Sequence, residues 1–314
     1  MRYNRVSSDA GEVNGTPAMM MPPAQALRDA FNAADRSQTD HNLDLVAQLG
    51  YALSPSIQGY AGIAQKNRSA SYQERYLWLP LEATGGLADG QLYTGNIDLN
   101  PETAYQLEFG IDVSSATLSL APRIYYNRVD DYIQGTPLTM SSPAARISRM
   151  MNPDRSGPLQ FNNVDAELYG FDMDWQWQLN ANWSLSGLVN YVRGERRDID
   201  DNLYRIAPPN TSLRLNYSTR TWTASLENVL YASQDNVSTT NNEKSSAGYG
   251  IVNFNGSWQA LSAVQLAAGI DNLFDKHYRD HLGGYNRAAN PDIATGSRLP
   301  GYGRNFFARL LYTC

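Results

Sequence analysis

Cysteine is almost absent from this sequence: the only one is Cys314, the last residue, so no disulfide can form within the chain. Long apolar runs are also missing, and no stretch approaches the roughly 18 residues that a transmembrane helix requires. The residues after Met1 are polar and contain no hydrophobic region of a signal peptide. Basic residues are outnumbered, 25 against 31 acidic ones, and the net charge of −6 argues against a nucleic-acid partner. These absences alone would describe a soluble cytoplasmic protein.

Alternation of apolar and polar residues is the strongest feature that is present. Segments of about ten residues alternate with a period of two, the pattern of barrel strands that face lipid on one side and water on the other. The stretch from Glu167 to Leu179 shows it best. Its odd-numbered face carries Tyr169, Phe171, Met173, Trp175, Trp177 and Leu179, and its even-numbered face carries Gly170, Asp172, Asp174, Gln176 and Gln178. A register shift of one residue would place two aspartates against hydrocarbon, so the pairing is strongly specified.

The same alternation recurs along the chain, and the connections between strands alternate in length. Further alternating segments lie at 105–112, 118–126, 212–217 and 306–313. Short connections near 52–54, 114–116, 180–182, 218–220 and 259–262 separate long ones near 67–101, 128–164, 194–209, 231–246 and 272–303. Turns at one end and long loops at the other are how outer-membrane barrels are built. The sequence therefore predicts an all-β protein, a transmembrane antiparallel β-barrel with about eleven strands, the first near 42–51.

An odd number of strands has a consequence, because a complete bacterial barrel made from one chain has an even number. We therefore expect this wall to belong to a larger barrel, with residues 1–41 forming an outer loop or partial barrel segment and residues 42–314 the C-terminal half. The alternative is a soluble β-rich binding protein whose alternating strands face a packed core. Trp and Tyr near the strand ends, as in the aromatic girdles of membrane barrels, favour the membrane interpretation.

Three stretches resemble the family of TonB-dependent outer-membrane receptors. The first is Arg68–Tyr76 followed by Gly95–Thr103, and the second is Ile124–Ile133, which is similar to a strand that enters a long outer loop. The third is Gly269–Tyr278, which resembles the family's box in the penultimate strand. The residues that match this box are Asn272, Leu273, Phe274, Asp275 and Tyr278. The resemblance covers the chain from about residue 42 onward, with the three stretches in the family's order and spacing.

Resemblance to this family implies a barrel of twenty-two strands that encloses an N-terminal plug. It implies import of a scarce nutrient, a ferric siderophore or a metal complex, across the outer membrane by a receptor that is not an enzyme and has no cofactor. The implied surroundings are the lipid bilayer, lipopolysaccharide and the barrel-assembly machinery. Import in the family is energised by TonB, which engages a segment before the plug. This sequence contains neither the segment nor the plug, so TonB would be reached only through the missing plug.

The final strand departs from the family pattern. Outer-membrane barrels usually end in an aromatic residue, whereas this strand ends with Tyr312, Thr313 and Cys314. The two interpretations are a divergent terminus and an impaired signal for the assembly machinery. If assembly is impaired, Cys314→Phe should raise the amount of heat-modifiable folded barrel on a gel, and an unchanged amount would remove the terminus as a cause.

Catalytic groups are sparse, since His41, His277 and His281 are the only histidines and none lies in a nucleophile–base signature. An outer-membrane barrel enzyme is therefore the weaker alternative. His277 and His281 stand beside two aspartates and could ligate a metal, although a spacing of four residues aligns two ligands only on a helix. The simpler interpretation is that both histidines are solvated residues at the rim of the barrel.

Two groups of side chains in the predicted outer loops are candidates for substrate binding. Thioethers select Cu(I), and methionines cluster at Met19, Met20 and Met21 and again at Met150 and Met151; the alternative is packing against other loops or a plug. Arginines bind anions through charge-assisted hydrogen bonds, and the candidates are Arg146 and Arg149 in one loop and Arg193 and Arg196 in another. They could equally pair with lipopolysaccharide phosphates or neighbouring acids. The substrate stays open between a ferric siderophore and a metal such as copper.

Overall fold

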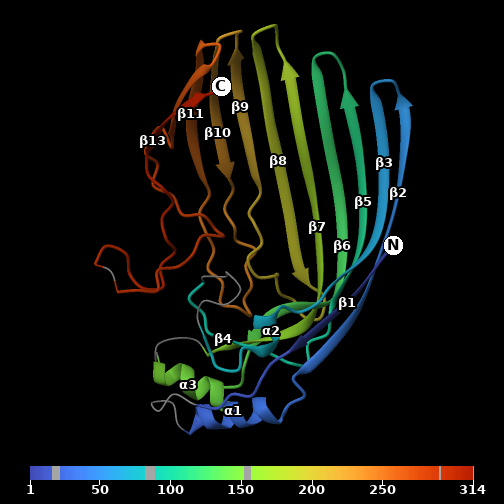
Figure 1. Cartoon of the computed structure of the whole chain (residues 1–314), viewed down its shortest axis with the longest axis vertical. Coiled ribbons are helices and arrows are strands. Elements are labelled where there is room, and N and C mark those ends of the chain that lie inside the picture. The colour runs from blue at the N-terminus through green and yellow to red at the C-terminus, as the bar shows by residue number, and fades with distance from the viewer. Residues whose placement is uncertain (16–21, 82–88, 152–156, 290, 314) are drawn as a thin grey trace.

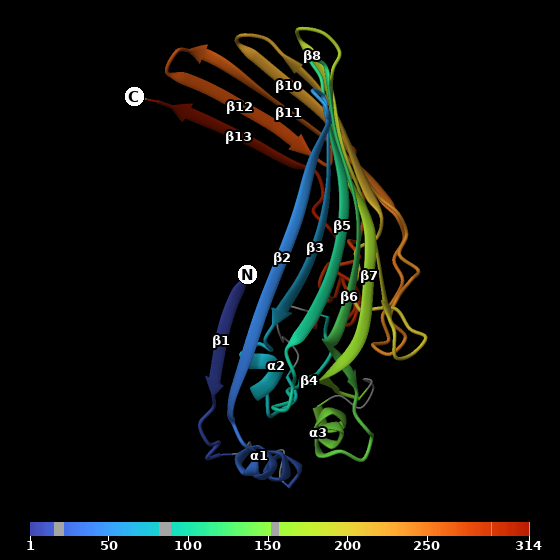
Figure 2. The same ribbon diagram turned by 90° about the vertical axis from the view of Figure 1, so that its right-hand side faces the viewer.

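A computed structural model describes residues 1–15, 22–81, 89–151, 157–289 and 291–313 (Figure 1). In it the chain forms one sheet of 13 strands: twelve follow one another in an antiparallel path, and a two-residue strand at 93–94 pairs in parallel off this path. Each strand of the main path pairs with its neighbour in sequence. The path runs through β1 (Arg2–Asp9), β2 (Ser37–Ser54), β3 (Ile57–Arg68), β5 (Glu102–Ser114), β6 (Leu118–Pro137), β7 (Leu159–Gln178), β8 (Trp183–Arg196), β9 (Asn210–Ser218), β10 (Trp222–Tyr231), β11 (Tyr249–Leu261), β12 (Val264–Asp271) and β13 (Asn305–Tyr312). The sheet is curved and not closed, so β1 and β13 are its two edges (Figure 2).

The predicted alternation is confirmed by the register of the ladders. One row across the sheet joins the apolar residues Leu107, Tyr126 and Tyr169, and polar residues such as Glu108 and Asn127 stand next to this row along β5 and β6. Large apolar side chains on this outer face stay exposed, as with Leu49, Ile124, Leu226 and Leu310. No second layer of described residues covers them, which is the arrangement of a wall that meets lipid and not of a soluble sandwich.

The opposite face of the strands is polar. Tyr60 donates a hydrogen bond to Glu108, and Arg123 forms an ion pair with Asp112. The same face carries Arg214, whose guanidinium lies 2.6 Å from a carboxylate oxygen of Glu227. The arginines named here are thus each paired with an acid on a polar face, as expected of a water-filled lumen wall.

Proline in the middle of β6 is tolerated because a neighbouring side chain replaces its missing donor. Pro122 pairs with Met173 on one side, while the ladder toward β5 is interrupted between Gly110 and Val113. Arg123 donates a hydrogen bond of 2.9 Å to the carbonyl of Ile111 in that gap. A carbonyl that proline leaves without its ladder partner is thereby satisfied.

The two ends of the sheet differ as predicted. One end has short turns, such as residues 55–56, 115–117, 219–221 and 262–263, and the other has long loops (Figure 1). Aromatic pairs lie near the short-turn end: Trp222 and Trp258 stack with ring centroids 5.3 Å apart, and Trp183 and Tyr217 meet at a tilt with ring centroids 4.8 Å apart. An aromatic belt at this end suits the boundary between hydrocarbon and water.

Several elements at the loop end were not predicted. Strand β1 and helix α1 (Pro23–Ala33) lie within residues 1–41, and the short strand β4 (Tyr93–Thr94) and helix α2 (Tyr72–Tyr76) lie within the loop after β3. Helix α3 (Pro143–Met151) lies in the loop between β6 and β7 and packs on α1 (Figure 2). In the described residues no helix is long and apolar enough to cross a membrane.

The buried residues also gather at the loop end. Three small clusters include Tyr93 with Phe161, Phe31 with Tyr76, and Leu203 with Ala166. Between the ends the strands have an open polar face and an exposed apolar face, and therefore no core. The loops are folded structures with their own packing, which allows them to hold side chains in place for binding.

Candidate functional site

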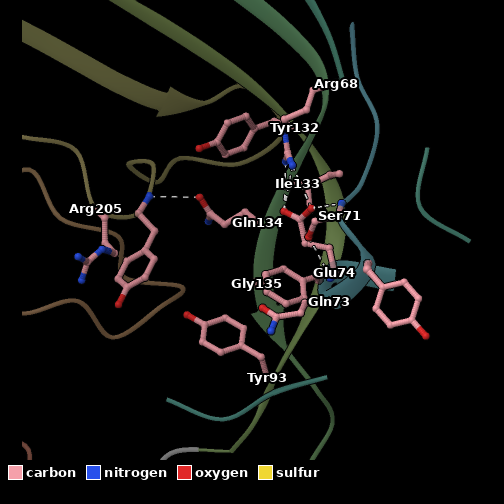
Figure 3. Close-up of a pocket in the computed structure, with 13 residues that line it drawn as sticks. Arg68, Ser71, Gln73, Glu74, Tyr93, Tyr132, Ile133, Gln134, Gly135 and Arg205 are labelled. Carbon is pink, nitrogen blue, oxygen red and sulfur yellow. Dashed lines mark hydrogen bonds and ion pairs between the residues drawn. The ribbon is translucent and has the colours of Figure 1, made fainter. Parts of the chain in front are cut away.

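A cavity of about 560 Å³ opens among the loops. Its wall is drawn in Figure 3 and comes from five segments: the end of β3 with α2, the strand β4, the end of β6, the start of β7 and the loop 197–209. The aromatic members are Tyr72, Tyr93, Tyr132, Phe161 and Tyr204. We call this cavity the aromatic pocket.

Helix α2 is fixed as one wall of the aromatic pocket by a capping box. The hydroxyl of Ser71 accepts from the backbone N–H of Glu74, and the Glu74 carboxylate accepts from the backbone N–H of Ser71. The guanidinium of Arg68 forms two ion pairs, one with the Glu74 carboxylate at 2.9 Å and one with the Glu102 carboxylate at 2.6 Å. Burial opposes ionisation of Glu74, but Arg68 and the Ser71 N–H outweigh it and hold the pKa of Glu74 below its ordinary value. Arg68 is therefore a structural cation whose charge is already matched.

Two tyrosines at the opposite wall share one carboxylate. The hydroxyls of Tyr93 and Tyr204 donate to the same oxygen of Asp89, at 2.6 Å and 2.8 Å. Burial, with the Asp89 charge second, raises the pKa of both hydroxyls, so both stay protonated and neutral. The Tyr93 ring stacks on Phe161 at 5.1 Å and lies against Gly135, where a Cβ atom would come within 2.6 Å of the ring. The packing thus requires glycine at position 135.

The loops around the aromatic pocket are bonded to one another. Gln134 of β6 donates to the side-chain oxygen of Asn241 at 3.0 Å and accepts from the backbone N–H of Tyr204. Asn241, which is fully buried, donates in turn to the carbonyl of Gly135. Asp201 accepts hydrogen bonds from Ser238 and from the backbone N–H groups of the two following threonines. The loops 197–209 and 232–248 therefore form one unit with the end of β6.

The predicted arginine candidates of the β8 region are paired with acids. Arg193 lies 2.8 Å from Glu195 on the outer face of β8, and Arg196 lies against Asp198. Arg197 lies 2.9 Å from Asp130. None of the three lines the aromatic pocket. The structure therefore shows the neighbouring acids as their partners and leaves substrate binding by Arg193 and Arg196 a prediction.

The predicted methionine and arginine candidates of the β6–β7 loop lie on or beside α3. Arg146, Arg149, Met150 and Met151 belong to this helix. Arg149 donates to the carbonyl of Met140 at 2.9 Å, and the side chains of Met140 and Met150 are more than half exposed. Met19, Met20 and Met21 lie outside the described residues. Their role stays a prediction, although the segment that follows them, α1, packs on α3.

The two loop histidines have different environments. His277 is exposed, whereas His281 is buried. His281 lies 3.1 Å from Glu243 through Nε2 and 2.9 Å from the Ser246 hydroxyl through Nδ1. The described residues hold no group of three or more His, Cys, Asp or Glu side chains that could bind a metal. The structure does not bring the two histidines together as a ligand pair.

The family box forms a tight bend at the end of β12. Asn272 has a φ of 49°, accepts from the Lys276 N–H at 2.8 Å, and donates to the carbonyls of Lys276 and Tyr302. Asp275, with a φ of 53°, accepts from the backbone N–H of Arg304. Asn and Asp tolerate this left-handed conformation better than other side chains, which explains the residue types. The other residues of the box have separate environments. The backbone N–H of Leu273 donates to the carbonyl of Val252, the side chain of Phe274 is exposed, and the ring of Tyr278 packs on Gly301.

The final strand keeps the predicted alternation in its register with β12, and Tyr312 pairs with Val264. Tyr312 is exposed at the sheet edge. Cys314 lies outside the described residues, so its effect stays a prediction.

The aromatic pocket itself was not predicted. Its lining residues span the chain from Arg68 to Arg205. Some of them fall in the stretches Arg68–Tyr76 and Ile124–Ile133 that resemble the family, but nothing in those stretches indicates that they meet around a cavity. A further signal in the sequence is the abundance of tyrosine, 20 residues in all.

An antiparallel wall with a polar inner face, an apolar outer face, short turns at one end and folded loops at the other defines the class of transmembrane β-barrels. Within that class, the chain belongs to the family described as TonB dependent receptor-like, beta-barrel, which matches residues 1–273. This is an outer-membrane family of receptors. No curated protein sequence matches the chain significantly.

Solved structures with the same fold include three receptors. The copper transporter OprC aligns with a TM-score of 0.74 and 24% identity over 89% of this chain. The ferric enterobactin receptor PfeA of Pseudomonas aeruginosa aligns with a TM-score of 0.61 and 20% identity over 88% of this chain. The siderophore receptor PirA of Acinetobacter baumannii aligns with a TM-score of 0.62 and 16% identity over 89% of this chain. The chain spans only 41%, 40% and 41% of these structures, respectively. At these identities the likeness establishes the fold.

Proposed function

We propose that this chain forms the C-terminal part of the barrel of an outer-membrane receptor that imports a ferric siderophore or a similar metal complex with energy from TonB. The observation that supports it most directly is the aromatic pocket. Ligand sites are concave, largely apolar and provided with a few fixed polar groups, and a volume of about 560 Å³ is in their usual range. Siderophores are organic chelators that such a pocket can contact.

Pocket chemistry suits an organic chelate better than a bare cation. Arg68 is neutralised by two carboxylates, and Tyr93 and Tyr204 are neutral hydroxyls held on Asp89. What the pocket offers to a ligand is therefore aromatic surface with fixed hydrogen-bonding groups at its margin. Offset contact with an aromatic ring contributes about 0.5–1.5 kcal/mol beyond the area it buries.

Substitution of Tyr132 tests this proposal in the receptor that carries the barrel segment. Tyr132→Ala should weaken binding of a ferric siderophore by up to about tenfold, because one aromatic wall is removed. Fluorescence quenching gives the affinity, and growth under iron limitation gives transport. Tyr191→Ala, on the outer face of β8, is the matched control. Equal affinity of parent and Tyr132→Ala for every siderophore tried would contradict the proposal.

Copper is the second candidate substrate, favoured by exposed thioethers on one side of the loop cluster. Met140 and Met150 are 53% and 56% exposed, so both side chains are accessible to a ligand. Soft thioether sulfur prefers Cu(I). Replacing both with leucine should abolish thioether-dependent Cu(I) binding in a competition titration, while leaving siderophore binding unchanged. Retention of Cu(I) affinity in the double variant would exclude these two methionines as ligands.

A further inference from the structure

A second cavity, of about 500 Å³, lies between the loops 232–248 and 272–304, away from the aromatic pocket. Both loops lie beside the C-terminal strands, and the orange-to-red loop 272–304 is seen clearly in Figure 1. Five of the side chains that line the cavity are basic: Lys244, Lys276, His277, Arg279 and Arg298. We call it the basic pocket. No residue lines both this cavity and the aromatic pocket.

Among the residues that the structure describes, the exposed lysines and arginine of the basic pocket have no acidic partner. Lys276 and Arg279 form no ion pair with any described carboxylate, and the ammonium group of Lys244 donates to the carbonyl of Gly296 at 3.3 Å. Elsewhere in the loops arginines meet acids, as Arg68 and Arg197 do. The basic pocket therefore concentrates positive charge in a protein whose net charge is −6.

The acids next to these cations in the sequence are bonded to other donors. Asp275 accepts from the backbone N–H of Arg304 at 2.8 Å. Asp280 accepts from the Tyr249 hydroxyl at 3.0 Å and from the backbone N–H of Leu282 at 2.7 Å. Neither carboxylate forms an ion pair with a basic side chain of the described residues.

Arg298 lies at the base of the pocket and is only 8% exposed. Its guanidinium donates to the Tyr285 hydroxyl at 2.7 Å, to the Lys244 carbonyl at 3.0 Å, and to Nδ1 of His281 at 3.1 Å. Guanidinium cannot accept a hydrogen bond, so Nδ1 of His281 is the acceptor and its Nε2–H donates to Glu243. A neutral imidazole thus separates Arg298 from that carboxylate. A buried cation without a direct anionic partner is costly, which favours binding of an anion beside it.

We propose that the basic pocket binds a compact oxyanion with two or more negative charges, held by Arg298 at its base and by Lys276 and Arg279 at its mouth. Arginine provides paired N–H donors to phosphate or carboxylate oxygens, and lysine adds a mobile point charge. The anion can come from two sources, a phosphate group of outer-leaflet lipopolysaccharide or a soluble phosphate or carboxylate. This proposal is independent of the aromatic pocket and of the substrate proposed for it.

Calorimetric titration of the receptor that carries this segment tests the proposal, with inorganic phosphate, citrate and lipopolysaccharide micelles as separate probes. At least one probe should bind, more weakly as salt increases, because exposed charges are screened. The double variant Lys276→Gln/Arg279→Gln should lower that affinity by about tenfold or more. The control Lys66→Gln/Arg220→Gln removes one lysine and one arginine outside the pocket and should bind as the parent does.

The titrations distinguish a soluble anion, a lipopolysaccharide phosphate and the absence of an anion site. Binding of phosphate or citrate that is lost in the double variant supports a soluble anion, and binding of lipopolysaccharide alone that is lost in the same way supports the lipid source. No binding of any probe, or equal affinity in parent and double variant, overturns the proposal. Arg298→Gln extends the test to the buried cation; because that variant can misfold, the exposed pair decides the result.

Discussion

At the scale of single residues, Asp201 determines how two outer loops are joined. Burial opposes its ionisation, but hydrogen bonds from Thr240 and Thr239 outweigh that effect and lower its pKa to about 2. Each of these hydrogen bonds is made to the charged form. The contact between loops 197–209 and 232–248 therefore depends on an ionised carboxylate, and acid is expected to release it.

A pH dependence follows from the sign of this shift. A carboxyl whose pKa is lower in the folded state adds stability above its unfolded pKa, near 3.9, and that stability is lost as the pH falls toward the folded value of about 2. We expect hydrogen-exchange protection of loop 232–248 to persist at pH 5 and to decrease between about pH 4 and pH 2. Asp201→Asn should show low protection throughout this range. Protection in the variant equal to the parent's at pH 5 would show that the charge is not required.

Asn272 offers a second test at the residue scale, because it combines a left-handed backbone with three side-chain hydrogen bonds. Asn272→Ala loses both features and should lower the free energy of unfolding by roughly 1–3 kcal/mol. Asn272→Gly keeps the backbone conformation accessible and should lose less. Urea titration of the receptor that carries each variant separates the contributions. A glycine variant as destabilised as the alanine variant would assign the whole effect to the hydrogen bonds.

At the scale of elements, the strands were predictable and the loops were not. The eleven predicted strands are β2, β3 and β5 to β13, and each was found because a period of two is visible in the sequence itself. Strand β1 was missed because its residues are nearly all polar, and its partners in β2 lie 28 to 42 residues away, from Asp9 with Ser37 to Arg2 with Asp44. The aromatic pocket depends on contacts such as that between Gln134 and Asn241, 107 positions apart, which no local pattern records.

The two faces of one strand give a matched pair of substitutions. In β10, Leu226 is on the apolar face and the adjacent Ser225 is on the polar face, where it donates to Asn255. Leu226→Arg should destabilise the barrel by about 2–4 kcal/mol if it lies near the middle of the bilayer, and Ser225→Arg should cost less because it meets water. Folded fractions in lipid vesicles, read by heat-dependent gel mobility, provide the comparison. The reverse order of stability would invert the assignment of the faces.

At the scale of the whole molecule, the open sheet determines what the chain can do alone. The edges β1 and β13 carry backbone groups that the described residues leave without a ladder on one side. In hydrocarbon each such group costs several kcal/mol. Stable insertion therefore requires strands that cover both edges.

Expression of this chain alone should give aggregated or degraded material and little heat-modifiable protein in the outer membrane. Fusion to the plug and the remaining strands of a family member should restore a heat-modifiable band, since both edges are then paired. Fractionation followed by gel mobility with and without boiling measures both. A heat-modifiable band from the chain alone would show that the edges can close on each other or on a second copy.

The hydrogen bonds between the loops also bear on how such a receptor changes over evolutionary time. Asn241 joins loop 232–248 to β6, Asp201 joins it to loop 197–209, and His281 joins it to loop 272–304. A loop grafted singly from a relative would lose its partners in the other two. These three loops are therefore expected to be inherited and recombined together, so that a new specificity arises by exchange of the whole set.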